Sequence, residues 1–375
     1  MGKMGVIRIL HILHSMNRGG AENAIMNYYR HIDRGKVQFD FLLTEQNKCQ
    51  FEDEIKSLGG KIYRVPLLRM TNPIPYIKAV ATFFNEHREY KIVHSHTSSK
   101  SVFPLWIAKR GGVPVRIAHS HNTKSEKGIR GWIRNIFKIP LKRVATNLCA
   151  CGNEAAIWLY GNKYFNKGKV TILPNVIECS RFAYNEHKRK EVRSQLHIDD
   201  NTLILGCVAR FSLQKNLLFL IDMFSELHQQ LTNSKLLLLG DGELKEDIIN
   251  QVQKYNLRES VIMTGVVPNV SDYEQAMDVF LMPSFFEGLP LSLIEAQISG
   301  LKCFASTGVP QEADKTGLVS FIPLDKGPHY WAEQIVDQLP YTRRSYLHEM
   351  QEAGYDAETS AKKLQDYYLH LIQEI

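Results

Sequence analysis

Residues 282–296 read Met-Pro-Ser-Phe-Phe-Glu-Gly-Leu-Pro-Leu-Ser-Leu-Ile-Glu-Ala, which has the form of a strand end, a short loop and a helix. The apolar run at 279–282 predicts the strand. Pro290 is expected in the first helical turn, where an N–H would be unpaired in any case. Unpaired N–H groups at a helix N-terminus bind anions. Because Glu287 and Glu295 flank that N-terminus, the stretch predicts a site for a sugar nucleotide, a phosphate-bearing ligand with hydroxyl groups on both sides.

The composition is that of a globular protein large enough for two domains. The chain has 375 residues, of which 44% are hydrophobic and 23% are charged. Its sequence contains neither the ~20 consecutive apolar residues that cross a bilayer nor a secretory signal. The six cysteines are scattered through apolar runs, which is typical of buried free thiols in a reducing compartment. We therefore expect a cytoplasmic protein.

Charge divides the chain into two unlike parts. Residues 1–180 hold 28 Lys and Arg against 12 Asp and Glu, whereas the remainder holds 18 against 27. A basic part joined to an acidic part is typical of two domains with different partners. The basic part predicts an anionic partner: nucleic acid, an anionic membrane surface or a phosphorylated substrate.

The first half alternates strand-like and helix-like segments and begins with a glycine loop. A strand at 6–13 is followed by Asn17-Arg18-Gly19-Gly20-Ala21-Glu22 and by a helix expected from 21 to 31. Gly19 and Gly20 either form a tight turn or let a ligand approach the backbone closely. The loop lacks the G-x-G-x-x-G spacing of dinucleotide-binding proteins. The alternation predicts a parallel sheet that binds ligands at the carboxyl ends of its strands.

Three histidines lie at expected strand ends in this half. Short apolar segments at 91–94 and 113–118 predict strands that end beside His96, His119 and His121. A single histidine there would be an ordinary solvated loop residue. Three histidines on one rim favour a functional pocket, with His121 as its main member and His119 as the rival.

The segment at 124–143 combines many basic side chains with Trp132, Ile133, Ile136 and Phe137 at roughly helical spacing. Such a helix can lie on an anionic bilayer surface, or it can be an ordinary surface helix that covers the core. Nucleic acid is not an expected partner, because no recognised binding motif or stacking platform accompanies the charge.

The second half begins a new alternating series after a polar run at 185–201, which we interpret as a linker. A strand at 203–209 is followed by Arg210, by Lys215 and by a helix at 217–231. An arginine fork and a lysine point charge at a strand-to-helix junction suit a diphosphate group. Further strands are expected at 236–239 and 261–265, and a final helix at 357–375.

In this order, the motifs resemble those of the GT-B glycosyltransferases in the retaining, nucleotide-sugar-dependent group called family 4. Within that group the chain is similar to bacterial enzymes that build exopolysaccharide or capsule. The resemblance covers nearly the whole chain, and its most specific part is Glu287 and Glu295 with seven residues between them. The other motifs that carry it are Gly19-Gly20, His119-Ser120-His121-Asn122, Pro174-Asn175, Arg210 with Lys215, and Gly240-Asp241-Gly242.

The resemblance implies an α/β protein with two Rossmann-like domains whose parallel sheets face each other across a deep cleft. Residues 1–178 would bind the acceptor, with a helix at about 357–375 crossing back to them, and residues 179–356 would bind the nucleotide sugar. The implied reaction moves a sugar, with retention, from a UDP-linked donor to a lipid-linked saccharide in exopolysaccharide or capsule biosynthesis. The enzyme would then work peripherally on the inner face of the plasma membrane.

The resemblance also implies roles for individual residues. Glu287 and His121 would bond the transferred sugar, and Glu295 would bond the ribose. Arg210 and Lys215 would neutralise the diphosphate as it leaves, a preorganised electrostatic role. The remaining expected donor contacts are Gly19, Gly20, Gly242, Gly265, Gly288 and Leu289.

No metal or other cofactor is expected at the donor site. Arg, Lys and helix N–H groups can stabilise a departing diphosphate, and no Asp-x-Asp cluster is placed to hold a divalent cation. Two alternative functions fit the same architecture. A sugar-nucleotide epimerase or hydrolase would need no acceptor. A non-catalytic saccharide-binding protein would have little reason to keep both glutamates and the two cations.

Overall fold

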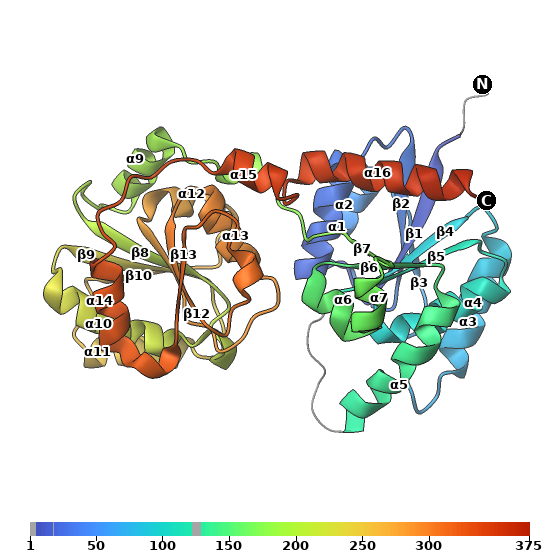
Figure 1. The fold of residues 1–375 in the computed structure, drawn as a ribbon, viewed down its shortest axis with the longest axis horizontal. Helices are drawn as coiled ribbons and strands as arrows, with labels where there is room; N and C mark the ends of the chain where they lie inside the picture. The colour runs from blue at the N-terminus through green and yellow to red at the C-terminus, as the bar shows by residue number, and fades with distance from the viewer. Residues whose placement is uncertain (1–4, 18, 122–128) are drawn as a thin grey trace. The chain divides into compact units, whose positions relative to one another are not determined.

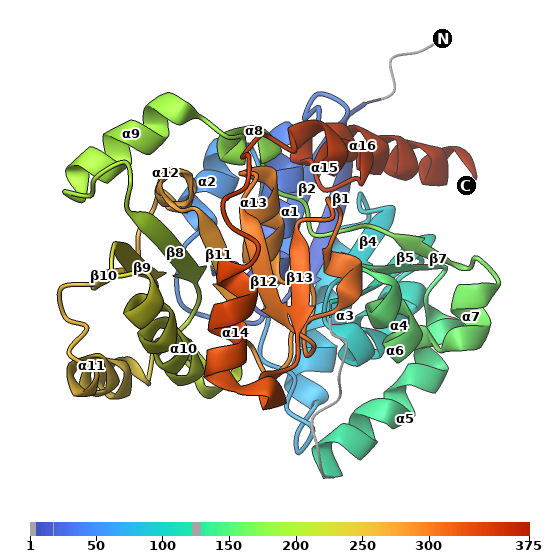
Figure 2. The ribbon, with the colours of Figure 1, turned by 60° about the vertical axis from the view of Figure 1, so that its left-hand side comes forward.

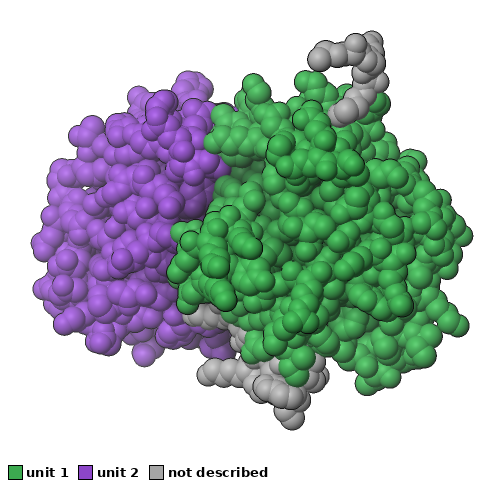
Figure 3. Space-filling model, turned by 45° about the vertical axis from the view of Figure 1, so that its right-hand side comes forward, with its two compact units in different colours: residues 1–177, 356–375 green, residues 178–355 purple. Residues whose placement is uncertain are grey.

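The computed structural model describes residues 5–17, 19–121 and 129–375, and at 129–134 it describes the backbone alone. Arg18, Asn122, Lys124 and Lys127 of the sequence motifs lie outside the described residues. The chain forms two compact units, one of residues 1–177 with 356–375 and the other of residues 178–355, shown in different colours in Figure 3. Each unit is built on its own sheet.

The described part of unit 1 contains a seven-stranded parallel sheet (Figure 1). Its strands are β1 (Ile7–Leu13), β2 (Val37–Leu43), β3 (Ile62–Arg64), β4 (Ile92–Ser95), β5 (Val115–Ser120), β6 (Asn147–Ala150) and β7 (Val170–Ile172), in the order β3-β2-β1-β4-β5-β6-β7. Every residue of β2 is buried, as expected of a strand whose sheet is covered on both faces. Because the strand order changes direction at β1, a ligand crevice is expected between the carboxyl ends of β1 and β4.

Helices cover both faces of this sheet. They are α1 (Gly20–His31), α2 (Glu52–Ser57), α3 (Ile74–Glu86), α4 (Val102–Arg110), α5 (Ile129–Val144), α6 (Asn153–Tyr160), α7 (Asn162–Asn166) and α16 (Ala357–Gln373), with a 3₁₀ turn η1 (Ser98–Ser101). One hydrophobic core packs α1, α2 and α16 against the sheet, and a second packs α3, α4, α5 and α6 against it. The final helix α16 lies beside α1, near the start of the chain (Figure 1).

The described part of unit 2 contains a six-stranded parallel sheet (Figure 2). Its strands are β8 (Leu203–Val208), β9 (Ser234–Leu239), β10 (Val261–Gly265), β11 (Val279–Met282), β12 (Lys302–Ser306) and β13 (Val319–Ile322), in the order β10-β9-β8-β11-β12-β13. The direction of the order changes at β8, next to β11. Two parallel-sheet units of this kind confirm the expected α/β class with two Rossmann-like domains.

The helices of unit 2 also pack on the sheet. They are α8 (Cys179–Phe182), α9 (Glu186–Gln195), α10 (Leu217–Gln230), α11 (Lys245–Lys254), α12 (Val270–Ala276), α13 (Leu291–Ile298), α14 (Gly327–Val336) and α15 (Leu347–Glu352), with 3₁₀ turns η2 (Leu213–Lys215), η3 (Gln311–Ala313) and η4 (Leu324–Lys326). The core beneath α10, α11 and α14 contains the fully buried Trp331. Two further helices contact the strands directly: α12 contacts β8, and α13 contacts β11 and β12.

The polar run at 185–201 is not a linker, as the sequence suggested, but contains helix α9. Asn185 caps this helix, because its side-chain oxygen accepts a hydrogen bond of 3.0 Å from the Lys188 N–H. The helix contacts α12, and one of its two buried residues is Arg193, which is 1% exposed. The prediction was wrong because an arginine, rather than an aliphatic side chain, supplies much of the buried face.

Arg193 joins three segments of unit 2. Its guanidinium donates to the carbonyl oxygens of Ala276 and Asp199, both at 2.9 Å, and also to the Thr202 carbonyl. The Asp278 carboxylate lies 3.4 Å away. These bonds to its terminal nitrogen atoms lower the cost of burying an arginine, although the Nε atom has no partner among the described residues. Arg193 therefore fastens α9 to the end of α12 and to the turn that leads into β8.

Replacing Arg193 by methionine should destabilise unit 2 by about 1–3 kcal/mol, because the carbonyls of Ala276 and Thr202 lose a buried donor. Asp278 keeps its ion pair with Arg189 and the hydrogen bond from the Ile204 N–H. Chemical denaturation followed by circular dichroism measures this loss. Lys190→Met on the same helix is the control. Lys190 is 63% exposed, so this change should leave the free energy of unfolding nearly unaltered. Equal stability of the two variants would contradict the role assigned to Arg193.

Candidate active site

The candidate donor site lies where the loops after β8 and β11 leave the sheet of unit 2. These two strands are neighbours, and ligands of doubly wound sheets bind at the carboxyl ends of such strands. The loops are tied together, since Phe285 N–H donates to the Gln214 carbonyl at 2.9 Å and the Asn216 side chain donates to the Pro283 carbonyl at 3.1 Å. Asn216 has a positive φ of 56°, which turns the chain sharply from η2 into α10.

An ion pair between Lys215 and Glu287 forms the centre of this site. Lys215 Nζ lies 2.7 Å from Glu287 Oε1, and the two side chains are 21% and 7% exposed. Gln214 Nε2 lies 3.4 Å from the other carboxylate oxygen, Oε2. Charges this poorly solvated are stable only as partners. The sequence analysis assigned Lys215 and Glu287 to the donor site separately, and the structure shows a direct contact between them.

The N-terminus of α13 differs by one residue from the sequence prediction. Pro290 is the N-cap, with φ −81° and ψ 97°, rather than a residue of the first turn. Its carbonyl accepts from the N–H groups of Leu293 and Ile294 at 3.1 and 3.3 Å, which starts the helix at Leu291. Within the described residues, four backbone N–H groups near this end make no hydrogen bond, those of Gly288, Leu289, Leu291 and Ser292. Together they form an anion-binding end.

Arg210 follows β8 but does not join the Lys215–Glu287 pair. It is 76% exposed, and its guanidinium lies 3.2 Å from Glu243 Oε2. It lines an open pocket of about 430 Å³ at the carboxyl ends of β8 and β9, together with Asp241 and Val266. A pocket of this size holds a nucleoside-sized ligand. Arg210 is thus placed beside a cavity rather than inside the ion pair.

Gly242 and Gly265 lie near this pocket, and the backbone favours glycine at the two positions for different physical reasons. A Cβ on Gly242 would lie 2.4 Å from the Phe211 carbonyl oxygen, so close backbone packing excludes any side chain there. Gly265 ends β10 with a φ of +70°, and its carbonyl accepts from the Gly240 N–H at 2.9 Å. Each of these glycines is the chain neighbour of a residue that lines the pocket, Asp241 or Val266.

Glu295 is half-buried in the middle of α13 and lies near Glu274, which is fully buried. Burial raises the pKa of Glu295 to about 7, and the positive charge of Arg181 partly opposes this shift. Burial and the charge of Glu295 together raise the pKa of Glu274 well above its ordinary value. Glu295 is therefore a carboxyl group whose charge changes near neutral pH.

In unit 1, the glycine loop lies at the crevice between β1 and β4. Gly19 is the N-cap of α1 in an extended conformation, and Gly20 is the first residue of the helix. A Cβ on Gly20 would meet nothing within 4 Å, and one on Gly19 would meet only the flexible Glu22 side chain. Glu22 and His96 line an adjacent open pocket of about 250 Å³. Internal packing does not require either glycine, which leaves room for a ligand near the backbone.

The histidines of unit 1 are arranged differently from the sequence prediction. Strand β5 extends to Ser120, so His119 lies within the strand and is only 4% exposed, instead of standing beyond a strand end. His121 follows the strand and is half-buried. The two further histidines of this group are His11 on β1 and His94 on β4, each 1% exposed. Sequence reasoning missed both as site residues.

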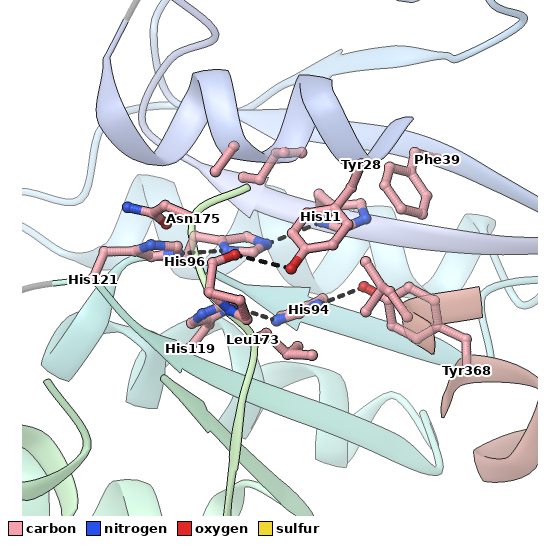
Figure 4. Close-up of a pocket in the computed structure, with 14 residues that line it drawn as sticks. His11, Tyr28, Phe39, His94, His96, His119, His121, Leu173, Asn175 and Tyr368 are labelled. Carbon is pink, nitrogen blue, oxygen red and sulfur yellow. Dashed lines mark hydrogen bonds between the residues drawn. The ribbon is translucent and has the colours of Figure 1, made fainter. Parts of the chain in front are cut away.

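A hydrogen-bonded chain connects three of these side chains (Figure 4). His11 Nδ1 lies 3.0 Å from His96 Nε2, and His96 Nδ1 lies 2.9 Å from His121 Nε2. Burial lowers the pKa of His121 to about 4, an effect that the Asn175 side chain partly opposes. His121 is therefore a neutral imidazole at pH 7 that can donate or accept one hydrogen bond. Of the two candidate rim residues, His121 is the more exposed.

Two family models match the chain in succession. The model described as "Glycosyl transferase 4-like domain" matches residues 19–176, and the model described as "Glycosyl transferases group 1" matches residues 188–314. The first covers Gly19, Gly20 and the grouped histidines of unit 1 other than His11. The second covers Arg210, Lys215, Glu287 and Glu295 of unit 2.

Relatives match over most of their lengths. The chain is 37% identical over 369 residues to the protein named glycosyltransferase EpsF of Bacillus subtilis (strain 168), covering 96% of each. It is 26% identical over 277 residues, 72% of each chain, to an Escherichia coli enzyme named UDP-Gal:alpha-D-GlcNAc-diphosphoundecaprenol alpha-1,3-galactosyltransferase.

A similar fold occurs in the crystal structure of Anabaena Alr3699/HepE in complex with UDP and glucose. The TM-score is 0.74 at 16% identity, over 97% of this chain and 100% of that one. A sequence identity of 16% shows only that the two proteins share a fold. The similarity to EpsF, by contrast, extends over nearly the whole sequence. The chain therefore belongs to the group 1 glycosyl transferases and is a glycosyltransferase.

Proposed function

We propose that this glycosyltransferase transfers a sugar, with retention, from a UDP-linked donor to a lipid-linked saccharide during the biosynthesis of a bacterial exopolysaccharide or capsule. The observation that carries the proposal is the Lys215–Glu287 pair, 2.7 Å apart, beside free N–H groups at the start of α13. This combination offers a cation and backbone donors to a diphosphate and a carboxylate to sugar hydroxyls. A nucleotide sugar carries both a diphosphate and sugar hydroxyls and can therefore use all of these contacts.

The names of the similar proteins support the donor and acceptor. The E. coli relative is named for a UDP-linked sugar and a diphosphoundecaprenol acceptor, and the Anabaena protein was crystallised with UDP and glucose. In this chain, the pocket of about 430 Å³ beside Arg210 has room for the nucleoside part of UDP. The Gly265–Val266 turn borders it and supplies backbone groups for the base.

The proposed transition state has a positive, oxocarbenium-like sugar and a departing diphosphate. Lys215, Arg210 and the N–H groups of Gly288 and Leu289 would stabilise the growing negative charge on the diphosphate. This assignment needs no metal ion at the diphosphate. Glu287 would hold sugar hydroxyls, because an ion-paired carboxylate is a poor covalent nucleophile. The departing phosphate oxygen would then take the proton from the acceptor hydroxyl on the same face.

Unit 1 would supply the acceptor surface. Among the described residues, no helix is long and apolar enough to span a membrane, so contact with a lipid-linked acceptor would have to be peripheral. The proposed membrane contact is α5, whose side chains at 129–134 lie outside the described set. Lys138 and Lys142 of α5 are not free for this purpose. Their Nζ atoms donate to the carbonyls of Trp158 at 2.8 Å and Tyr160 at 2.9 Å.

Glu287→Gln should reduce transfer at least about 100-fold while leaving the fold intact, because it removes both the sugar contact and the charge that balances Lys215. Transfer of radiolabelled sugar from UDP donors to a lipid-linked acceptor measures the loss, and NMR of the anomeric proton of the product tests retention. Glu246→Gln, at an exposed site in the first turn of α11, is the matched control. Full activity of Glu287→Gln, or release of sugar without any acceptor, would refute the proposal.

Glu295 gives the proposed donor site a pH dependence. If its ionised carboxylate accepts hydrogen bonds from the ribose, affinity for a UDP-sugar should rise as the pH passes upward through about 7, where the carboxyl loses its proton. A UDP-sugar is the right probe because its diphosphate diester does not titrate in this range. Calorimetry from pH 6 to pH 8 should show the rise in the wild type and a flat profile in Glu295→Gln. A pH-dependent affinity that persists in that variant would assign the effect elsewhere.

Charge reversal at Arg130 and Arg134 should weaken binding to anionic vesicles by at least about 30-fold, since each lost cation near an anionic surface is worth ~1 kcal/mol. Co-sedimentation with phosphatidylglycerol vesicles measures the change, with phosphatidylcholine vesicles as the uncharged reference. Lys163→Glu with Lys167→Glu is the control, because it removes the same charge from exposed positions of unit 1 outside α5. Equal release of both double variants would show that overall charge, rather than α5, holds the protein to the membrane.

A further inference from the structure

Five histidines gather on one face of the unit 1 sheet (Figure 4). His11 on β1 is in register with His94 on β4, and side chains two residues apart on a strand share a face, which adds His96. His94 is in turn in register with Ile117 on β5, so His119 and His121 follow on the same face. The convergence is therefore a consequence of strand pairing.

These imidazoles are buried in an unusual setting. Their surroundings are mostly apolar or aromatic, including Phe39, Ile25 and Leu364. A neutral imidazole in such surroundings offers a nitrogen lone pair to a metal ion.

The nitrogen atoms converge closely enough to share one ion. In the group of His11, His94 and His96, one ring nitrogen from each side chain lies within 4.8 Å of the other two. Zinc–nitrogen bonds of about 2.0–2.1 Å in a tetrahedron place ligand atoms about 3.4 Å apart. The His11–His96 nitrogen distance is already 3.0 Å. Binding of the ion would bring the remaining nitrogen pairs from within 4.8 Å to that spacing.

We propose that His11, His94 and His96 bind one divalent transition-metal ion of the zinc, cobalt, nickel or copper class. Imidazole nitrogen is a preferred ligand for these metals and a poor one for magnesium or calcium. A cavity of about 20 Å³ next to the rings has room for a single water-sized fourth ligand. His96 also lines the open pocket of about 250 Å³, which provides a route for the ion.

Side chains next to the proposed ligands hold two of the histidine rings in orientations that suit metal binding. The His94 Nδ1 atom lies 2.7 Å from the Tyr368 hydroxyl, an outer contact that fixes the ring and leaves Nε2 for the metal in place of its present partner His119. The Nδ1 atom of His96 keeps its 2.9 Å contact with His121, which leaves Nε2 of His96 for the metal. A metal on His96 would thereby hold His121 in one tautomer and one orientation.

A second group of three, His96, His119 and His121, also has nitrogen atoms within 4.8 Å of one another. We assign the site to the inner group for two reasons. His11 and His94 are more deeply buried than His121, and the inner group leaves His121 free for the hydrogen bond expected of it at the sugar. The inference goes beyond the proposed function, because binding of the ion needs neither donor nor acceptor. It also concerns a different place from the diphosphate, where no metal is expected.

Metal binding to the full-length, tag-free protein tests the proposal. Chelator-treated protein should take up one Zn²⁺ per chain, measured by plasma mass spectrometry after gel filtration, and should gain thermal stability from Zn²⁺ but not from Mg²⁺. Co²⁺ should give the visible absorption of a four-coordinate site, and X-ray absorption of the Zn²⁺ form should show imidazole nitrogen at about 2.0–2.1 Å. Failure to retain a stoichiometric ion would overturn the proposal.

Variants assign the ligands. His11→Gln should lower zinc affinity by at least about 100-fold, the upper range for loss of a mere outer-shell partner. His14→Gln, at an exposed histidine just after β1, should leave affinity unchanged. His94→Gln provides a second ligand test, with circular dichroism showing whether each variant folds. If His119→Gln abolished binding while His11→Gln and His94→Gln preserved it, the assignment to the inner group would be wrong.

Discussion

The whole structure depends on one topological constraint, the change of direction of strand order at β1 in unit 1 and at β8 in unit 2. Parallel strands require crossover helices, and right-handed crossovers on either side of such a strand place their helices on opposite faces. The loops after the two adjoining strands then diverge and leave space between them. In unit 2 these loops carry Lys215 and Glu287, and in unit 1 they carry Gly20 and His96. The candidate sites thus follow from the path of the chain.

Much of the fold and the donor site could be predicted from the sequence because the relevant strands are continuous apolar runs. Those runs locate the strand ends, and the polar residues directly after them are natural candidates for ligand contact. The sequence does not specify which ends meet. Lys215 and Glu287 are 72 residues apart, and their contact exists because β8 and β11 are neighbours in the sheet. Strand order is a tertiary property, so the expected groups were recognisable but their pairing was not.

The missed features have a common physical origin, which is the burial of polar side chains. Helix α9 escaped notice because Arg193 occupies a buried position, where its terminal nitrogen atoms donate to backbone carbonyls. His11 and His94 escaped notice because histidine in an apolar run has no strong preference for surface or core. A signal for the cluster is present in the sequence, in the alternate spacing of His94 with His96 and of His119 with His121. This spacing does not reveal His11, which joins the cluster because β1 pairs with β4 and places His11 opposite His94.

The two units differ in the kind of electrostatics that they offer to the proposed reaction. Unit 2 presents fixed charges that are held by partners in advance, and in the proposed reaction these would stabilise the leaving diphosphate. Unit 1 presents a neutral imidazole at His121, because burial lowers its pKa to about 4. In the proposed reaction, the neutral ring of His121 would offer the transferred sugar a hydrogen-bonding nitrogen, whereas unit 2 would offer fixed charges to the diphosphate.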